Sequence, residues 1–460
     1  MKNEQTELIS RRFSRGTLIS AKAGFILFLV LLAIIPLMLV KSTITERNTR
    51  YSQAVAEISH AWSHAQHISG PVLIIPYSVS TRNKDNNLQK VIKNMVCLPE
   101  SLEINANVEP EKRYRGMFEA VVYKSNLEIK GVFSVPSITQ MDQFNFLKGA
   151  ELLWNSGKVV LGITDMRRLK GELALNWNGQ SVAFSPDSGA TSFLRSAIQA
   201  SALNLKPATS SYKIPFSFKL HLDGSDSMHF LPFGMSTNIA MQSTWPHPSF
   251  IGAFLPEHRQ ITNEGFKASW EISHFGRAYP QIFGDDQMTD AMNEVIGKSS
   301  FGVRFLQPVD TYRQSERAIK YGMLFIIFTF LVYFLFELIT GIRIHIFQYA
   351  LVGIALCVFF LLLVALAEHI GFGWAYSLGA AFVIGQISFY SLKVVKTLKR
   401  TLTVSAVLTL LYVYLYVALR LEDYALLIGS FGLFVSLTFI MFAVRNVDWF
   451  AETKDQPKLQ

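Results

Sequence analysis

Residues 23–40 read AGFILFLVLLAIIPLMLV, an apolar stretch without a charged side chain. An α-helix rises about 1.5 Å per residue, so roughly 20 apolar residues cross the ~30 Å hydrocarbon core of a membrane. Five later segments have the same character, and only residues 321–338 contain a charge, Glu337, near one end. The other four are residues 349–367, 374–392, 401–419 and 424–444. The sequence therefore predicts six transmembrane helices.

The first apolar stretch has two interpretations, because a cleaved signal peptide also places a basic segment before an apolar core. The residues that follow, KSTITE at 41–46, contain no small-x-small cleavage pattern. A retained signal anchor is therefore the preferred interpretation.

The distribution of lysine and arginine predicts the orientation, because short cytoplasmic loops are rich in these residues. With residues 1–22 inside, the cytoplasmic segments carry 13 of them against five acidic residues. The short outer loops hold only Arg420, beside three carboxylates. Both termini are thus expected in the cytoplasm, the second being residues 445–460.

The same segments explain nearly all of the formal net charge of +9. The excess positive charge is therefore concentrated in the predicted cytoplasmic segments, where it suits contact with anionic lipid. Nucleic acid is not an expected partner. The two cysteines, Cys97 and Cys357, fall in an outer region and a predicted span, so no disulfide is expected.

Residues 41–317 lie between the first and second predicted spans and are long enough for a domain with its own core. Residues 45–69 have helical character up to Gly70-Pro71. Alternating apolar residues then predict strands at 102–108 and 127–135. Two hairpins are expected, one turning at Asn178-Gly179 and one at Asp223-Gly224 between residues 214–222 and 228–230. Short helices are expected at 140–147 and 191–203.

These patterns predict an α+β membrane protein. A six-helix transmembrane bundle (residues 318–444, after the first span) carries a large, mostly antiparallel β-rich periplasmic domain inserted between helices 1 and 2.

Several long motifs resemble those of the CreD family of inner-membrane proteins, and together they cover nearly the whole chain. They include GPVLIIPY from Gly70, RYRGMFEA with Arg115 and Gly116, TDMR with Asp165 and Arg167, and WPHPSFIGAFLP from Trp245. Further motifs are FGVRFLQPVDTYRQSERAIKYGMLFI at 301–326, FLFE ending at Glu337, QYALVG from Gln348 and AEHIGF from Ala367.

The resemblance implies an inner-membrane protein of Gram-negative bacteria that is linked to a two-component regulon, envelope stress and the response to β-lactams. It implies no reaction and no cofactor. The motif residues are candidates for partner binding or coupling.

Three histidines, His60, His64 and His67, share one face if residues 45–69 are helical, a geometry that suits zinc or copper. The sequence offers no fourth ligand, so a polar helix face is the preferred interpretation.

His247 lies between two prolines, which favour extended backbone. It suits a partner-binding loop or, the preferred interpretation, a turn packed under Trp245 and nearby phenylalanines. Asp310 and Arg317 precede the second span, where their charges are expected to pair at the junction or to couple the outer domain to the helices.

Ionisable groups near hydrocarbon are functional suspects, because burying a charge is costly. Glu337, Glu368 and His369 all lie at span ends, so we expect them to be interfacial groups rather than parts of a proton path.

No nucleotide-binding loop, metalloprotease motif or nucleophile elbow occurs in the sequence. The leading hypothesis is a non-enzymatic envelope protein that binds the bilayer and an unidentified periplasmic or inner-membrane protein or envelope component. The alternatives are a transporter or channel with a periplasmic substrate-binding domain, and a periplasmic enzyme.

Overall fold

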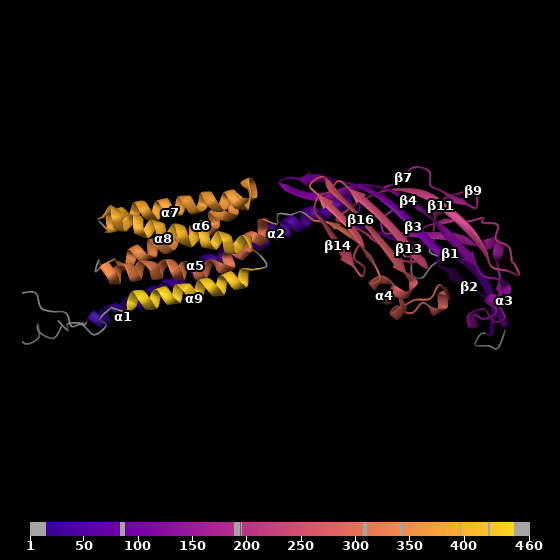
Figure 1. Ribbon diagram of the computed structural model, residues 1–460, viewed down its shortest axis with the longest axis horizontal. Coiled ribbons are helices and arrows are strands. Elements are labelled where there is room, and N and C mark those ends of the chain that lie inside the picture. The colour runs from indigo at the N-terminus through magenta and orange to yellow at the C-terminus, as the bar shows by residue number, and fades with distance from the viewer. Residues whose placement is uncertain are drawn as a thin grey trace, which may run out of the picture. The chain divides into compact units, whose positions relative to one another are not determined.

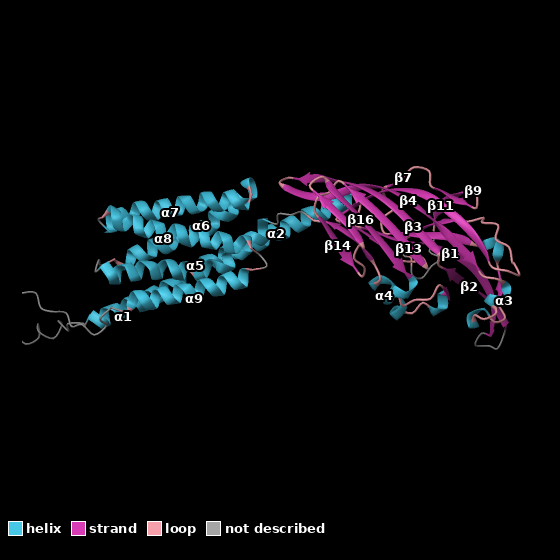
Figure 2. Ribbon diagram, viewed as in Figure 1, coloured by secondary structure: helices cyan, strands magenta, loops and turns pink. Residues whose placement is uncertain are grey.

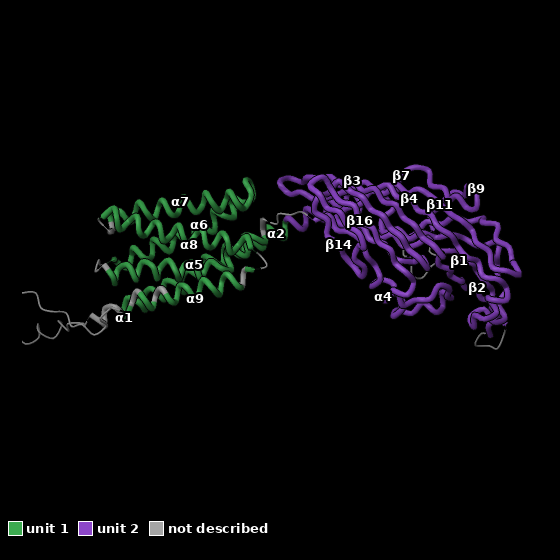
Figure 3. The backbone as a smooth tube through the Cα atoms, in the orientation of Figure 1, with its two compact units in different colours: residues 1–50, 309–460 green, residues 51–308 purple. Residues whose placement is uncertain are grey.

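The computed structural model describes residues 15–82, 88–187, 194, 196–306, 311–340, 344–395, 397–421 and 424–445. The chain forms two compact units (Figure 3). We call Met1–Arg50 with Val309–Gln460 the helical unit, and Tyr51–Pro308 the sheet unit.

Apolar helices make up the helical unit (Figure 1). They are α1 (Arg15–Leu32), the first part of α2 (Ile34–Trp62), α5 (Thr311–Thr340), α6 (Ile346–Ile370), α7 (Phe372–Val395), α8 (Leu398–Arg420) and α9 (Ala425–Val444). Aliphatic and aromatic side chains make up their buried faces, and aromatic rings from α5, α6, α7 and α8 pack together in one cluster.

Five helical segments are long and apolar enough to cross a membrane. They are Ser20–Trp62, Arg313–Ile339, Ile346–Ile370, Phe372–Lys393 and Leu398–Arg420. In α9 the apolar stretch found among the described residues is shorter, Leu427–Thr438. The sixth span therefore stays a prediction.

Strands dominate the sheet unit (Figure 2). In one sheet, which we call sheet B, eight strands lie side by side. Their order is β15 (His258–Thr262), β16 (Gly265–Ser273), β13 (Ser236–Ser243), β3 (Ser101–Arg115), β4 (Phe118–Val135), β11 (Tyr212–Ser225), β8 (Ala174–Trp177) and β9 (Gln180–Pro186). The short β7 (Leu169–Lys170) also pairs with β11.

The second sheet, sheet A, is built around β1 (Gln66–Arg82). On one edge of β1 lie β12 (Ser227–Phe230) and β2 (Leu88–Cys97), extended by β18 (Phe301–Phe305), β14 (Pro248–Gly252) and β17 (Ile282–Gly284). On the other edge lie β5 (Glu151–Leu152), β6 (Lys158–Ile163) and β10 (Ala197–Ala200). Strand β9 pairs with both β8 and β10, so it joins the two sheets.

The main core lies between the sheets, and β1 is buried on both of its faces. Leu73 and Ile75 pack into the core shared with sheet B. Val72 and Ile74 point the other way and pack with Ile296 of α4 (Asp290–Lys298). A strand covered on both faces needs a nearly continuous apolar run, which the VLII sequence provides. The remaining short elements are α3 (Ile138–Met141), η2 (Asn145–Leu147), η3 (Trp154–Ser156), η4 (His274–Gly276) and η5 (Asp285–Gln287).

Most expected strands are present, including those at 102–108 and 127–135 and the hairpin at Asn178-Gly179. The expected helix at 140–147 is present as the short pieces α3 and η2. The helix expected at 191–203 is wrong in its described part, because β10 pairs there with β6 and β9.

The expected hairpin at Asp223-Gly224 is also wrong. Strand β11 continues through both residues to Ser225 and pairs with β4. Gly224 is needed because a Cβ there would overlap the buried ring of Tyr123. The chain instead leaves sheet B at Asp226, whose φ is 61°, and enters sheet A as β12.

The helix expected over residues 45–69 ends earlier, at Trp62, and β1 begins at Gln66. Gly70 is a strand residue whose φ of +120° suits glycine, beside a register shift between Ser69 and Val72.

Candidate functional site

The C-terminal end of α2 docks on the β3–β4 hairpin within the sheet unit. Ile58 packs against Ala120 and Val122 in a small apolar cluster. The Trp62 indole N–H donates to the carbonyl oxygen of Tyr123 at 3.5 Å. The last turns of α2 are thus fixed against the sheet by apolar contact and a side-chain hydrogen bond.

Two guanidinium groups lie over the Trp62 ring. The Arg168 Cζ is 3.9 Å from a ring centroid and the Arg113 Cζ is 4.7 Å away. Cation–π contacts of this kind are worth about 0.5–1 kcal/mol each at exposed sites. Arg168 also donates to the buried Asp223 carboxylate at 2.9 Å.

Asp165 and Arg167 hold the end of α2. The Arg167 guanidinium donates to both Asp165 carboxylate oxygens, and its Nη1 donates to the carbonyl oxygen of His60 at 2.7 Å. Asp165 also accepts from the backbone N–H of His64 at 3.1 Å. These hydrogen bonds, chiefly from Arg167, hold the pKa of the Asp165 carboxyl well below its usual range.

Gln66 connects this ion pair to sheet B. The nitrogen of its buried amide lies 2.9 Å from the hydroxyl oxygen of Ser63 and from the carbonyl oxygens of Asp165 and Asp223, and these three acceptors share its two N–H donors. Its Oε1 accepts from the Asp165 N–H at 3.2 Å. We call the set Trp62, Gln66, Asp165, Arg167, Arg168 and Asp223 the α2 clamp.

Arg115 also contacts α2, and Gly116 follows it in the chain. Arg115 forms an exposed ion pair of 2.6 Å with Glu57 of α2. Gly116 occupies the turn of the β3–β4 hairpin with a φ of 61°. The structure thus brings Arg115 and Arg167 to the last turns of α2, although 52 positions separate them in the sequence.

The Trp245 motif holds the segment by which the chain leaves the sheet unit. The Trp245 indole N–H donates to the carbonyl oxygen of Leu306 at 2.9 Å, and the Leu306 N–H donates to that of His247 at 3.2 Å. Trp245 belongs to the core, but the His247 side chain is exposed. The expectation that His247 packs beneath the aromatic residues is therefore wrong.

Two ion pairs connect α1 and α2 to the rest of the helical unit. Glu337 contacts Lys22 and also accepts from the Tyr349 hydroxyl at 2.8 Å. Glu368, whose side chain is 9% exposed, lies 3.6 Å from Arg47. The two glutamates are thus paired groups within the unit.

His369 is exposed in the last turn of α6, and Arg317 is half-buried in α5. Asp310 lies outside the described residues.

The three histidines do not share a helix face, so that expectation is wrong. His60 is in α2, His64 follows the helix and His67 is in β1. His67 stacks instead on His229 with ring centroids 4.2 Å apart. Burial and the neighbouring His67 lower the pKa of His229 to about 4. Among the described residues, no group of three or more histidine, cysteine or carboxylate side chains could hold a metal ion.

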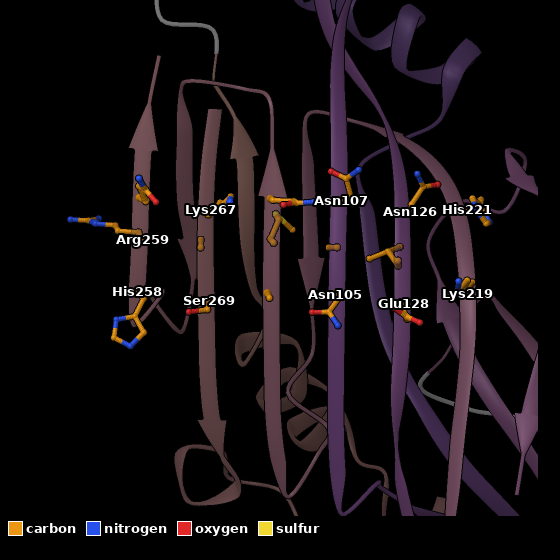
Figure 4. Close-up of a pocket in the computed structure, with 17 residues that line it drawn as sticks. Asn105, Asn107, Asn126, Glu128, Lys219, His221, His258, Arg259, Lys267 and Ser269 are labelled. Carbon is orange, nitrogen blue, oxygen red and sulfur yellow. The ribbon is translucent and has the colours of Figure 1, made fainter. Parts of the chain in front are cut away.

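The outer face of sheet B carries a polar hollow of about 800 Å³ (Figure 4). Asn105 and Asn107 of β3 lie at its middle, with Asn126 of β4 beside them. Sequence analysis missed this face and also the buried Gln66. The alternation that predicts the core positions of β3 and β4 also marks their outward amides, whereas no local pattern identifies Gln66.

Comparison with known proteins covers both units. A family model described as "Inner membrane protein CreD" matches residues 18–450. The chain is also 32% identical over 429 residues to the inner membrane protein CreD of Escherichia coli (strain K12), and the alignment covers 92% of each protein.

Proposed function

Because the chain belongs to the CreD family of inner membrane proteins, we propose that it serves cell envelope integrity or the envelope stress response by binding and relay, without catalysis. Both termini are cytoplasmic in this proposal, and the sheet unit is periplasmic. The sheet unit binds a periplasmic partner or an envelope component, and α2 carries the bound state to the membrane helices.

The α2 clamp is the observation that carries the proposal. Helix α2 is continuous from Ile34 to Trp62. Two motif residues, Arg115 and Arg167, contact its last turns, and Asp165 holds the Arg167 guanidinium. A helix held by a bidentate ion pair, a buried amide and a packed indole moves with the sheet to which it is held. A simple tether would need none of these contacts.

The interior of the helical unit favours an anchor or relay over a transporter, which would need polar groups around a central cavity. Among the described helices, Thr329 donates within its own helix and Tyr333 pairs with Ser391 at 2.8 Å. The surrounding buried residues are largely apolar and aromatic. The hydroxyls of Thr329, Tyr333 and Ser391 are thus satisfied by near neighbours.

Complementation tests the proposal in cells that lack their own copy and grow under β-lactam stress. Arg167→Gln and Trp62→Ala should each lose complementation while the protein reaches normal abundance in the membrane. Lys130→Gln, which removes an exposed ion pair of 2.9 Å on the same sheet, should complement fully. Full complementation by both clamp variants would contradict the relay.

A further inference from the structure

The outward side chains of sheet B form two rows that cross six strands (Figure 4). We call them the amide rows. The first row contains His221, Asn126, Asn107, Gln242, Lys267 and Gln260. The second row contains Lys219, Glu128, Asn105, Ala240, Ser269 and His258.

The amide rows differ from the rest of the same face. Beside them, Glu103 pairs with Lys130 at 2.9 Å, and Lys112 pairs with Glu119 at 3.0 Å nearer the hairpin end. Within the part of the chain that the structure describes, no side chain of the amide rows has a hydrogen bond or ion pair with another residue. Five primary amides therefore lie together with their donors and acceptors available.

Charge gives the hollow a preference for anions. Lys219 and Lys267 lie in the rows, Arg259 lines the β15 margin, and Glu128 is the one carboxylate in the lining. In the adjoining row Glu103 is paired with Lys130, and Glu271 adds a negative charge that disfavours an anion beyond the amide rows.

From this arrangement we infer that the amide rows bind an extended acidic polysaccharide that carries carboxylate and acetamido groups and lies across the strands. The inference rests on the proposed function, since it names the envelope component that the sheet unit binds. Lysine and arginine pair with the carboxylates through charge-assisted hydrogen bonds.

Amide chemistry and spacing both favour a polysaccharide. A primary amide offers a donor pair and an acceptor, which match the C=O and N–H of an acetamido group. Neighbouring strands lie about 4.8 Å apart, close to the repeat of an extended pyranose chain, so successive strands meet successive sugars. An extended polypeptide repeats at about 3.3 Å and is bound by sheets at their edges instead.

Calorimetry on the full chain in detergent micelles tests the inference with three probes. Hyaluronan oligosaccharide, which alternates glucuronate with N-acetylglucosamine, should bind. Chitin oligosaccharide, which has acetamido groups without charge, and polyglutamate, which has charge on a polypeptide, should each bind at least tenfold more weakly.

The triple variant Asn107→Ala/Asn126→Ala/Gln242→Ala should bind hyaluronan at least tenfold more weakly than the unaltered chain. Its unfolding midpoint should not change, because these side chains are exposed or half-buried. The matched control Glu103→Gln/Lys130→Gln changes the same sheet face outside the rows and should bind within twofold of the unaltered chain.

Three results would overturn the inference: absent hyaluronan binding, equal binding of polyglutamate, or unchanged affinity in the triple variant. The complementation assay with the clamp variants tests the proposed function independently of the ligand. If hyaluronan does not bind but the clamp variants lose complementation, only the ligand is wrong.

Discussion

Replacing Arg167 with glutamine should loosen the end of α2 by an amount that the contacts of this residue define. The change removes a bidentate pair with Asp165 and the hydrogen bond to the His60 carbonyl oxygen. Hydrogen bonds to charged groups contribute about 1.5–3 kcal/mol. The Arg167 side chain is 46% exposed and screened by solvent, but the Asp165 carboxylate is only 6% exposed. Leaving this buried acceptor without its charged partner costs about 2 kcal/mol.

The loss should depend on pH. Arg167 lowers the folded-state pKa of Asp165, so the pair stabilises the protein above the unfolded-state pKa of about 3.9 and the contribution fades as pH falls below it. The difference between the variant and the unaltered chain should therefore be largest near neutral pH and smaller at about pH 3.

Hydrogen exchange of the full chain in detergent micelles measures this effect at residues 60–68. A loss of about 2 kcal/mol corresponds to a roughly 30-fold loss of amide protection. Lys130→Gln is the control and should change protection there by less than twofold. A change below threefold for Arg167→Gln at neutral pH would refute the energetic importance of the clamp.

Glu337→Gln should destabilise the protein in detergent by about 1–3 kcal/mol, because Lys22 loses its counter-ion, yet it should keep complementation; lost complementation at normal abundance would favour proton translocation. A reporter active only in the cytoplasm should work after Lys399 and fail after Gly265; activity after Gly265 would reverse the orientation. Stability should fall as pH drops from about 6.5 towards 4 because only the unfolded His229 gains a proton there, and His229→Gln should weaken this slope; an unchanged slope would contradict the assignment.

The sequence predicts the parts of the fold that depend on local periodicity. Long apolar runs identify the membrane helices, and alternation identifies strands such as β4 and β11. These signals succeed because burial on one face imposes a fixed spacing on apolar residues.

Tertiary context decides the features that the sequence misses. Asp223-Gly224 has turn chemistry, but Arg168 and Lys170 bind the Asp223 carboxylate and Tyr123 fills the space beside Gly224. The strand therefore continues through a local turn signal.

The sequence likewise predicts only part of the candidate site. Motif resemblance indicates that Asp165 and Arg167 matter, but Arg167 donates to a carbonyl oxygen 107 positions away, at His60, and Asp165 accepts from the His64 N–H. A contact between residues so far apart in the chain produces no recognisable spacing pattern in the sequence. The amide rows also depend on the register of six strands, which only the assembled sheet defines.

The proposed relay requires α2 to be rigid, and residues 48–50 provide the most direct test because all three side chains are exposed. Replacing all three with glycine weakens the helix by about 1 kcal/mol per residue relative to alanine, without changing its length. In the β-lactam complementation assay at matched abundance, the relay predicts that the triple-glycine variant fails and the triple-alanine control succeeds. Equal complementation by the two variants would contradict the relay.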